Sequence, residues 1–119
     1  MKQLTKAEEE IMQALWQLKK ANVKSLIKIL PEPKPAYNTV STIVRILESK
    51  GFVDYEKQGK GHIYFPIVEK EAYSNQSINK LVDNYFQGSF ESMVSFFVKK
   101  NNVDVKDIET LLIEINKNK

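Results

Sequence analysis

The sequence predicts a mostly α-helical fold that contains one small β-hairpin. Apolar residues recur at helical spacing in segments that are separated by polar or proline-containing breaks. Two runs rich in aromatic and β-branched residues flank a turn that contains glycine. The chain has 119 residues, of which 42% are apolar and 28% charged, so we expect a folded soluble protein with either a single core or a small core plus an appendage that needs a partner.

The first two helices are expected from their start signals. Thr5 and Glu8 have the spacing of a capping box, in which each side chain accepts a hydrogen bond from a free backbone amide at the helix start. Asn22 can cap the second helix in the same way. The proline-rich segment 31–35 ends that helix, because proline lacks an amide hydrogen and biases the preceding residue to an extended conformation.

A third helix is expected over residues 37–50, and it has two different faces. One face is apolar and suits a core, whereas the other is polar, short-chained and nearly free of acidic residues. An ordinary surface helix carries Glu and Lys, but Asn, Ser, Thr and Arg are the side chains that reach base edges and phosphates from the DNA major groove. We interpret this element as a DNA recognition helix; a merely solvated polar face is the alternative. The apolar face comprises Val40, Ile43, Val44 and Leu47, and the polar face comprises Asn38, Ser41, Thr42 and Arg45.

Gly51 suits the left-handed position that follows this helix, and residues 52–57 and 62–66 then form the expected hairpin. The order helix, helix, turn, helix, hairpin is that of a winged helix-turn-helix domain, here residues 1–66. In that architecture the hairpin lies over the phosphates beside the recognition helix. Lys57, Lys60 and His62 lie at or beside the hairpin tip, where a basic donor could meet a phosphate; simple solvation is the ordinary alternative.

The distribution of charge agrees with this interpretation. The net charge is +3 and the pI is near 9.0. Residues 1–66 hold 11 Lys or Arg against 7 Asp or Glu, whereas residues 67–119 hold 7 against 8. The basic excess therefore lies in the half that contains the recognition helix.

Other functions are poorly supported. There is no Cys, which excludes disulfides and thiolate metal sites and suits a reducing cytosol. The single His has no companion at metal-ligand spacing, and there is no phosphate-binding loop, so we expect no catalytic residue, no metal and no cofactor. No membrane-spanning run or signal-peptide pattern is present, and we expect a cytoplasmic protein without membrane insertion.

The sequence of residues 67–119 predicts three short helices. Together they carry too much apolar surface to remain exposed to water. Ser89 and Asp104 are the expected caps of the second and third. A second copy of the chain is the simplest partner, which makes this region a dimerisation domain; folding back onto the first domain is the alternative. The residues expected at the dimer interface are Ile78, Leu81, Val82, Tyr85, Phe86, Phe96, Phe97, Ile108, Leu111, Leu112 and Ile115.

Five colinear segments resemble the penicillinase and methicillin-resistance repressors, the BlaI/MecI/CopY family. They are residues 4–8, 15–16, 36–42, 47–53 and 64–66. The resemblance implies a dimeric winged-helix repressor that binds a palindromic operator, with the third helix in the major groove and the hairpin on the backbone. By position, the family's DNA-contacting stretch would include Asn38, Thr39, Ser41 and Thr42.

The chain departs from the family pattern in three places. Many members have Arg where this chain has Ile46, so the base preference cannot be carried over. The copper-responsive branch ends in a cysteine-rich metal motif, which the absence of Cys rules out here. In the antibiotic-responsive branch a membrane-bound sensor metalloprotease triggers cleavage within the dimerisation helices, typically at an Asn-Phe bond. The matching bond here joins Phe96 and Phe97, so cleavage there is a hypothesis, and burial of both rings in a dimer core is the alternative.

Together these features predict a homodimeric, sequence-specific transcriptional repressor whose partners are operator DNA and a second copy. A membrane-bound sensor metalloprotease system is a further partner that the resemblance implies, with a ligand as the alternative signal. One alternative is a winged-helix protein-interaction module. We argue against it from the absence of a large apolar anchor on the predicted reading face. The other alternative is a non-specific, nucleoid-type DNA binder, against which the modest charge of the first domain argues.

Overall fold

A computed structural model describes residues 1–117 of the chain. Contacts divide the chain into two compact units, one ending at Gln76 and one beginning at Ser77. Within the described range the chain has helices throughout and one two-stranded antiparallel sheet, as the sequence predicts. None of the helices in this range has the length and apolar character needed to cross a bilayer.

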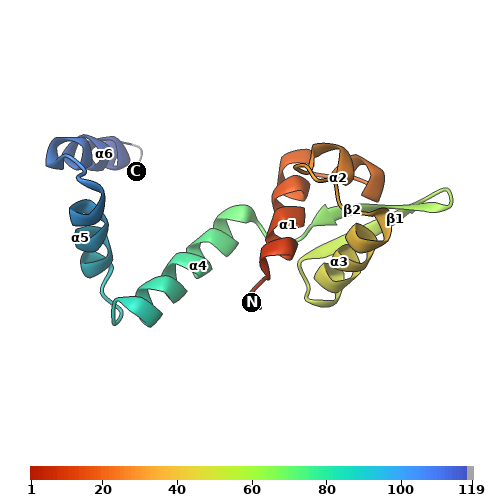
Figure 1. The fold of residues 1–119 in the computed structure, drawn as a ribbon, viewed down its shortest axis with the longest axis horizontal. Coiled ribbons are helices and arrows are strands. Elements are labelled where there is room, and N and C mark those ends of the chain that lie inside the picture. The colour runs from red at the N-terminus through yellow and green to blue at the C-terminus, as the bar shows by residue number, and fades with distance from the viewer. Residues whose placement is uncertain (118–119) are drawn as a thin grey trace. The chain divides into compact units, whose positions relative to one another are not determined.

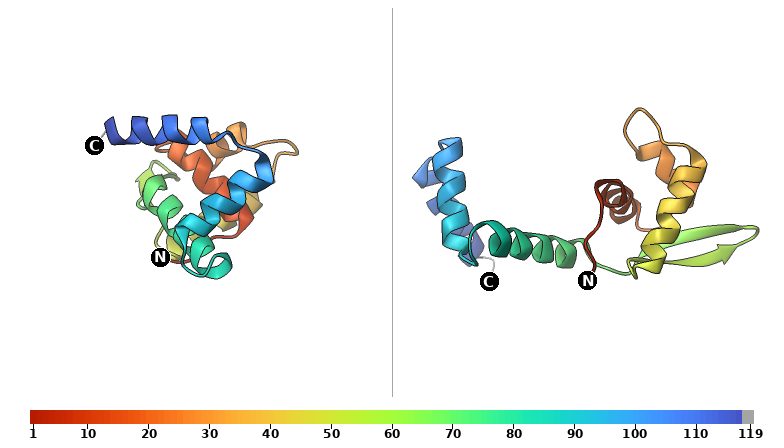
Figure 2. Two further views of the ribbon diagram at one scale, coloured as in Figure 1. Left: turned by 90° about the vertical axis from the view of Figure 1, so that its left-hand side faces the viewer. Right: turned by 60° about the horizontal axis from the view of Figure 1, so that its bottom comes forward.

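The first unit contains three helices and a hairpin, followed by the beginning of a fourth helix (Figure 1). The hairpin runs alongside α3, and its tip projects beyond the helices in Figure 1 and in the right-hand view of Figure 2. This arrangement leaves one long side of α3 next to the hairpin and the other next to α1. The elements are α1 (Lys6–Leu18), α2 (Val23–Ile29), α3 (Tyr37–Ser49), β1 (Val53–Gln58) and β2 (Gly61–Pro66).

The predicted start signals of α1 and α2 are confirmed. The Thr5 hydroxyl accepts a hydrogen bond from the Glu8 amide at 3.2 Å, and the Thr5 amide donates to Glu8 Oε1 at 2.9 Å. The Asn22 side chain accepts from the Ser25 amide at 2.8 Å. These local bonds satisfy amides that have no partner inside the helix, and they fix where each helix begins.

The end of α3 is confirmed as well. Gly51 has a φ of +83°, a conformation that costs little only for glycine. Its amide donates to the Glu48 carbonyl at 3.0 Å, and the next amide, that of Phe52, donates to the Leu47 carbonyl at 2.9 Å. This pair of bonds is a Schellman motif, which closes the helix and turns the chain directly into the hairpin.

The hairpin has a two-residue turn, Gly59 and Lys60, and its strands pair from Val53 with Pro66 to Gln58 with Gly61. Ala21, in the link between α1 and α2, extends this sheet by an isolated bridge to Tyr64. The two N···O distances of the bridge are 3.0 and 2.8 Å. The bridge was not predicted from the sequence, and it attaches the hairpin to the start of α2.

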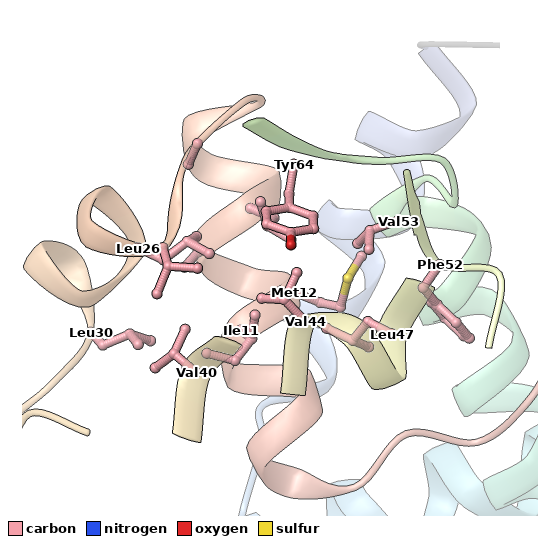
Figure 3. Packing of buried hydrophobic residues seen from close by; sticks show 14 of the residues in the cluster. Ile11, Met12, Leu26, Leu30, Val40, Val44, Leu47, Phe52, Val53 and Tyr64 are labelled. Atoms are coloured by element: carbon pink, nitrogen blue, oxygen red, sulfur yellow. The ribbon is translucent and has the colours of Figure 1, made fainter. Parts of the chain in front are cut away.

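The core lies between α3 and the other elements of the first unit (Figure 3). The predicted apolar face of α3 is turned into it, with Val40, Val44 and Leu47 fully buried and Ile43 partly buried. Each fully buried aliphatic side chain contributes about 1.5–3 kcal/mol to folding. This packing fixes the rotation of α3, so the polar face must point outward. Its buried partners include Met12, Leu15, Leu26, Phe52, Val53 and Tyr64.

The first unit extends beyond the boundary expected at Pro66, because α4 (Lys70–Tyr85) begins inside it. Tyr73 is buried, and its ring contacts Phe52 edge-on with centroids 5.6 Å apart. The Tyr73 hydroxyl accepts from the Leu4 amide at 3.1 Å and donates to Glu9 Oε1 at 3.0 Å. The first turn of α4 therefore holds the N-terminal segment in place.

The second unit contains the rest of α4 together with α5 (Phe90–Asn101) and α6 (Val105–Lys117). The predicted caps are confirmed: Ser89 Oγ accepts from the Ser92 amide at 3.1 Å, and Asp104 Oδ1 accepts from the Lys106 amide at 3.0 Å. Among the described apolar side chains of this unit, Val82 alone is buried. Those left largely exposed include Ile78, Leu81, Tyr85, Phe90, Phe96, Phe97, Leu111, Leu112, Ile113 and Ile115.

Candidate nucleic-acid interface

A groove of about 400 Å³ separates α3 from the hairpin, with the start of α2 at one side. Tyr37, Ser41 and Arg45 line its α3 wall, because residues four apart lie above one another on a helix. The hairpin contributes Lys60 and His62, near its tip. The groove is therefore formed by one face of α3 and by the hairpin. The bridge between Ala21 and Tyr64 attaches the hairpin to the helices. Its remaining lining residues are Asn22, Val23, Lys24, Gly61 and Tyr64.

The groove carries positive charge. Lys24, Arg45 and Lys60 line it, and no carboxylate is among its lining residues. The low-dielectric walls of a groove concentrate the field of such charges and attract polyanions. A phosphate backbone is a suitable occupant for the hairpin side of this groove.

An aromatic cluster positions the imidazole of His62. The rings of His62 and Tyr55 lie 4.5 Å apart between centroids, and His62 Nδ1 lies 3.4 Å from the Tyr64 hydroxyl. Tyr55 pairs directly with Tyr64 across the two strands. The exposed His62 ring is thus held on one face of the hairpin, with its edge available at the groove.

Tyr64 connects this cluster to the groove wall formed by α3. Burial raises the pKa of its hydroxyl above 10.0, and the positive charge of Arg45 opposes the rise only in part. Tyr64 is therefore neutral at physiological pH. Arg45 and Tyr64 both line the groove, from α3 and from the hairpin.

The predicted DNA-binding residues fall into groups around α3 and the hairpin. Ser41, Arg45, Lys60 and His62 meet at the groove. Asn38 and Thr42 are exposed on the outer surface of α3, beside Arg45 by helical geometry. Lys57 is exposed on β1 and pairs with His62 across the hairpin. Thr39 is exposed at the other edge of α3, in a hollow of about 290 Å³ that also involves the proline-rich loop and α1.

The structure adds two residues that were not predicted from the sequence. Tyr37 is 52% exposed at the first turn of α3, and Ile46 is 40% exposed next to Arg45. The prediction that the reading face has no large apolar side chain is therefore wrong. A helical projection of residues 37–50 could have revealed Ile46, since it lies on the side of α3 away from Val40 and Val44.

These features define the class of the protein: a winged helix-turn-helix protein with a cationic groove between its third helix and its wing. The family model described as penicillinase repressor matches residues 4–117. The chain belongs to the penicillinase repressor family, which confirms the resemblance noted from the sequence.

Curated relatives match along nearly the whole chain. The methicillin resistance regulatory protein MecI of Staphylococcus aureus (strain N315) is 28% identical over 116 residues, which cover 97% of this chain and 94% of that protein. The penicillinase repressor of Bacillus licheniformis is 25% identical over 120 residues, which cover 98% of this chain and 94% of that protein.

Solved structures match about 60% of the chain. The solution structure of the DNA-binding domain of the repressor BlaI has a TM-score of 0.53 and 28% identity, covering 60% of this chain and 88% of that one. The Bacillus licheniformis BlaI monomeric form in complex with the blaP half-operator gives a TM-score of 0.51 and 27% identity, covering 60% and 89%. Together with the element order, these matches confirm the predicted winged-helix fold.

Proposed function

We propose that the protein is a cytoplasmic, sequence-specific transcriptional repressor that binds operator DNA. The observation that carries this proposal is the cationic groove between α3 and the wing, next to a polar outer face of α3. Its relatives include proteins named as repressors, and a similar winged-helix structure is that of a repressor in complex with a half-operator. The bound protein would repress by occluding a promoter.

The proposed docking follows from the positions of the exposed side chains. α3 enters the major groove, where Asn38, Thr42 and Arg45 face base edges. The wing lies along the adjacent backbone, and its basic side chains meet phosphates. Ser41 and Thr39, on the two sides of α3, contact the backbones that border the major groove. The proposed phosphate contacts of the wing are Lys57, Lys60 and His62.

We further propose that the second unit forms a homodimer. Its apolar side chains are largely exposed in a single chain, and a hollow of about 760 Å³ lies between α4 and α5. A second copy would remove this surface from water, which is favourable by about 25 cal/mol per Å² of apolar area. Two copies related by a two-fold axis could then read the half-sites of a palindromic operator, about 34 Å apart. The hollow is lined by Leu81, Tyr85, Phe86, Met93, Val94, Phe96 and Phe97.

Release of the repressor is proposed to follow cleavage between Phe96 and Phe97 by a sensor metalloprotease system. Both side chains are exposed in α5, near its middle, so a cut would break the helix that lines the apolar hollow. A protease site engineered at this bond allows the test. The cleaved protein should dissociate into monomers and lose its affinity for operator DNA. Fragments that remain dimeric and bound to operator DNA would exclude cleavage as the release step.

The experiment that tests the main proposal is fluorescence anisotropy at two salt concentrations. The protein is titrated into a labelled duplex from upstream of its own gene and into a shuffled duplex of equal length. A preference of about a thousandfold or more for the native duplex would support specific repression. Equal, strongly salt-dependent binding to both would favour a non-specific DNA binder. No binding to either at low salt would favour a protein-interaction module, for which the exposed Tyr37 and Ile46 side chains would be the anchors.

A further inference from the structure

Ile46 is the large aliphatic side chain on the outer face of α3. It is 40% exposed and follows Arg45 directly. Thr42, one turn before it, and Ser49, three residues after it, are also exposed. The other neighbours of Ile46 on the helix surface are Lys50, which is polar, and Ile43, which is apolar and partly buried against the core.

An exposed isoleucine at this position of α3 contributes little to the stability of the helix or of the core. Isoleucine has a lower helix propensity than Ala, Lys or Glu, and an exposed isoleucine recovers little of that loss by burial. Its β-branched side chain is held in one preferred χ1 rotamer in a helix, so its methyl groups are already fixed in direction. A fixed apolar group in the middle of a polar reading face suits an apolar spot on an otherwise polar surface.

The DNA major groove has one such spot. Thymine carries a C5-methyl group there, and aliphatic side chains contact it in direct readout. A protein partner fits less well, because interface anchors fill pockets and belong to a contiguous apolar patch. The exposed neighbours of Ile46 are Thr42, Arg45 and Ser49, and its apolar neighbour Ile43 is partly buried against the core.

We propose that Ile46 recognises the C5-methyl group of a thymine, so that the half-site read by this repressor contains a thymine where Ile46 faces the groove. The proposal rests on the proposed function, since it assumes that α3 enters the major groove. Arg45 supplies the polar contact beside it, and Ile46 discriminates against bases that lack the methyl group.

The test begins with selection of preferred half-sites from randomised duplexes by the wild-type protein. Each thymine of the selected site is then replaced in turn by deoxyuridine, which removes only the methyl group. We expect one position at which this change weakens wild-type binding by about threefold to fivefold, as for the loss of one buried methyl group.

The variant Ile46→Ala identifies the side chain responsible. It should bind the thymine duplex several-fold more weakly than wild type and should no longer distinguish thymine from deoxyuridine at that position. Alanine raises helix propensity at this exposed site, so the fold should be kept, as circular dichroism can verify. Ile29→Ala is the matched control, because Ile29 is 38% exposed but lies at the end of α2. This control should keep the full methyl preference.

Two results would overturn the proposal while leaving repression intact. One is specific binding without a methyl effect at any thymine, and the other is a methyl effect that persists undiminished in Ile46→Ala. If wild type fails to distinguish selected from shuffled duplexes, the proposed function itself fails, and the proposal falls with it.

Discussion

Lys50 Nζ lies 2.6 Å from Glu8 Oε1, and this ion pair joins the end of α3 to the first turn of α1. Both side chains are largely buried, with 22% and 7% of their surfaces exposed. The same Glu8 oxygen also accepts a hydrogen bond from the Thr5 amide. The carboxylate that closes the capping box of α1 therefore also anchors the end of α3.

Glu8→Gln should lower the free energy of unfolding by about 1–3 kcal/mol, because it weakens charge-assisted hydrogen bonds in a partly buried site. Thermal or urea unfolding at neutral pH measures this change. Glu56→Gln is the control, since the pair between Glu56 and Lys20 has a longer N···O distance of 3.3 Å and is 59% exposed on both sides. Exposed pairs contribute about 0–1 kcal/mol, so equal losses in the two variants would contradict a special role for Glu8.

The same pair predicts a dependence of stability on pH. Burial alone would raise the pKa of the Glu8 carboxyl, but hydrogen bonds and the charge of Lys50 outweigh it and lower the pKa below 4.5. A carboxyl with a lowered folded-state pKa stabilises fully above its unfolded pKa and loses this contribution as pH falls through the folded pKa. The stability difference between wild type and Glu8→Gln should therefore be constant above about pH 5 and shrink toward pH 3. A constant difference across this range would show that the Glu8 charge does not matter.

Arg45→Ala should weaken operator binding about 5-fold to 150-fold, which corresponds to the loss of about 1–3 kcal/mol for a base-reading side chain. Anisotropy titrations measure the loss, and sedimentation should show an unchanged dimer. Binding to a shuffled duplex should weaken much less. If both duplexes lose affinity equally, Arg45 contacts phosphate and not bases.

Lys60→Ala should weaken binding to specific and shuffled duplexes alike. The slope of log K against log salt should become shallower by about 0.9 for each phosphate that the variant no longer neutralises. The salt titration of this variant is compared with that of Lys100→Ala, which removes the same charge from α5. A slope unchanged from wild type would place Lys60 in solvent and the wing away from the backbone.

Leu111→Asp should convert the proposed dimer to monomers, because it would place an unpaired charge in the proposed apolar interface. Sedimentation velocity detects the change, and operator affinity should fall with it. Ile67→Asp is matched in exposure, as both side chains are 55% exposed, but Ile67 lies in the first unit. A Leu111→Asp protein that stays dimeric would show that α6 is outside the interface.

The parts of the fold that follow from short-range chemistry were predictable from sequence. The capping box at Thr5, the cap at Asn22 and the left-handed Gly51 depend on residues within one turn of one another. The rotation of α3 was predictable too, since Val40 and Val44 could only turn inward.

Pairings between distant residues were not predictable in the same way. No local pattern indicates that Ala21 pairs with Tyr64, or that Glu8 meets Lys50. For the candidate site, the sequence indicated which face of α3 is polar. It did not show that the wing would bring Lys60 and His62 to Ser41 and Arg45 while Thr39 lies at the other edge.

The buried Tyr73 has a practical consequence for dissecting the protein. A fragment cut at Pro66 would lose the hydroxyl that holds both the Leu4 amide and Glu9, and would expose the ring face of Phe52. Such a fragment should fray at its N-terminus and aggregate through its bared aromatic surface. A minimal recombinant winged-helix fragment should therefore retain the first turns of α4 through Gln76.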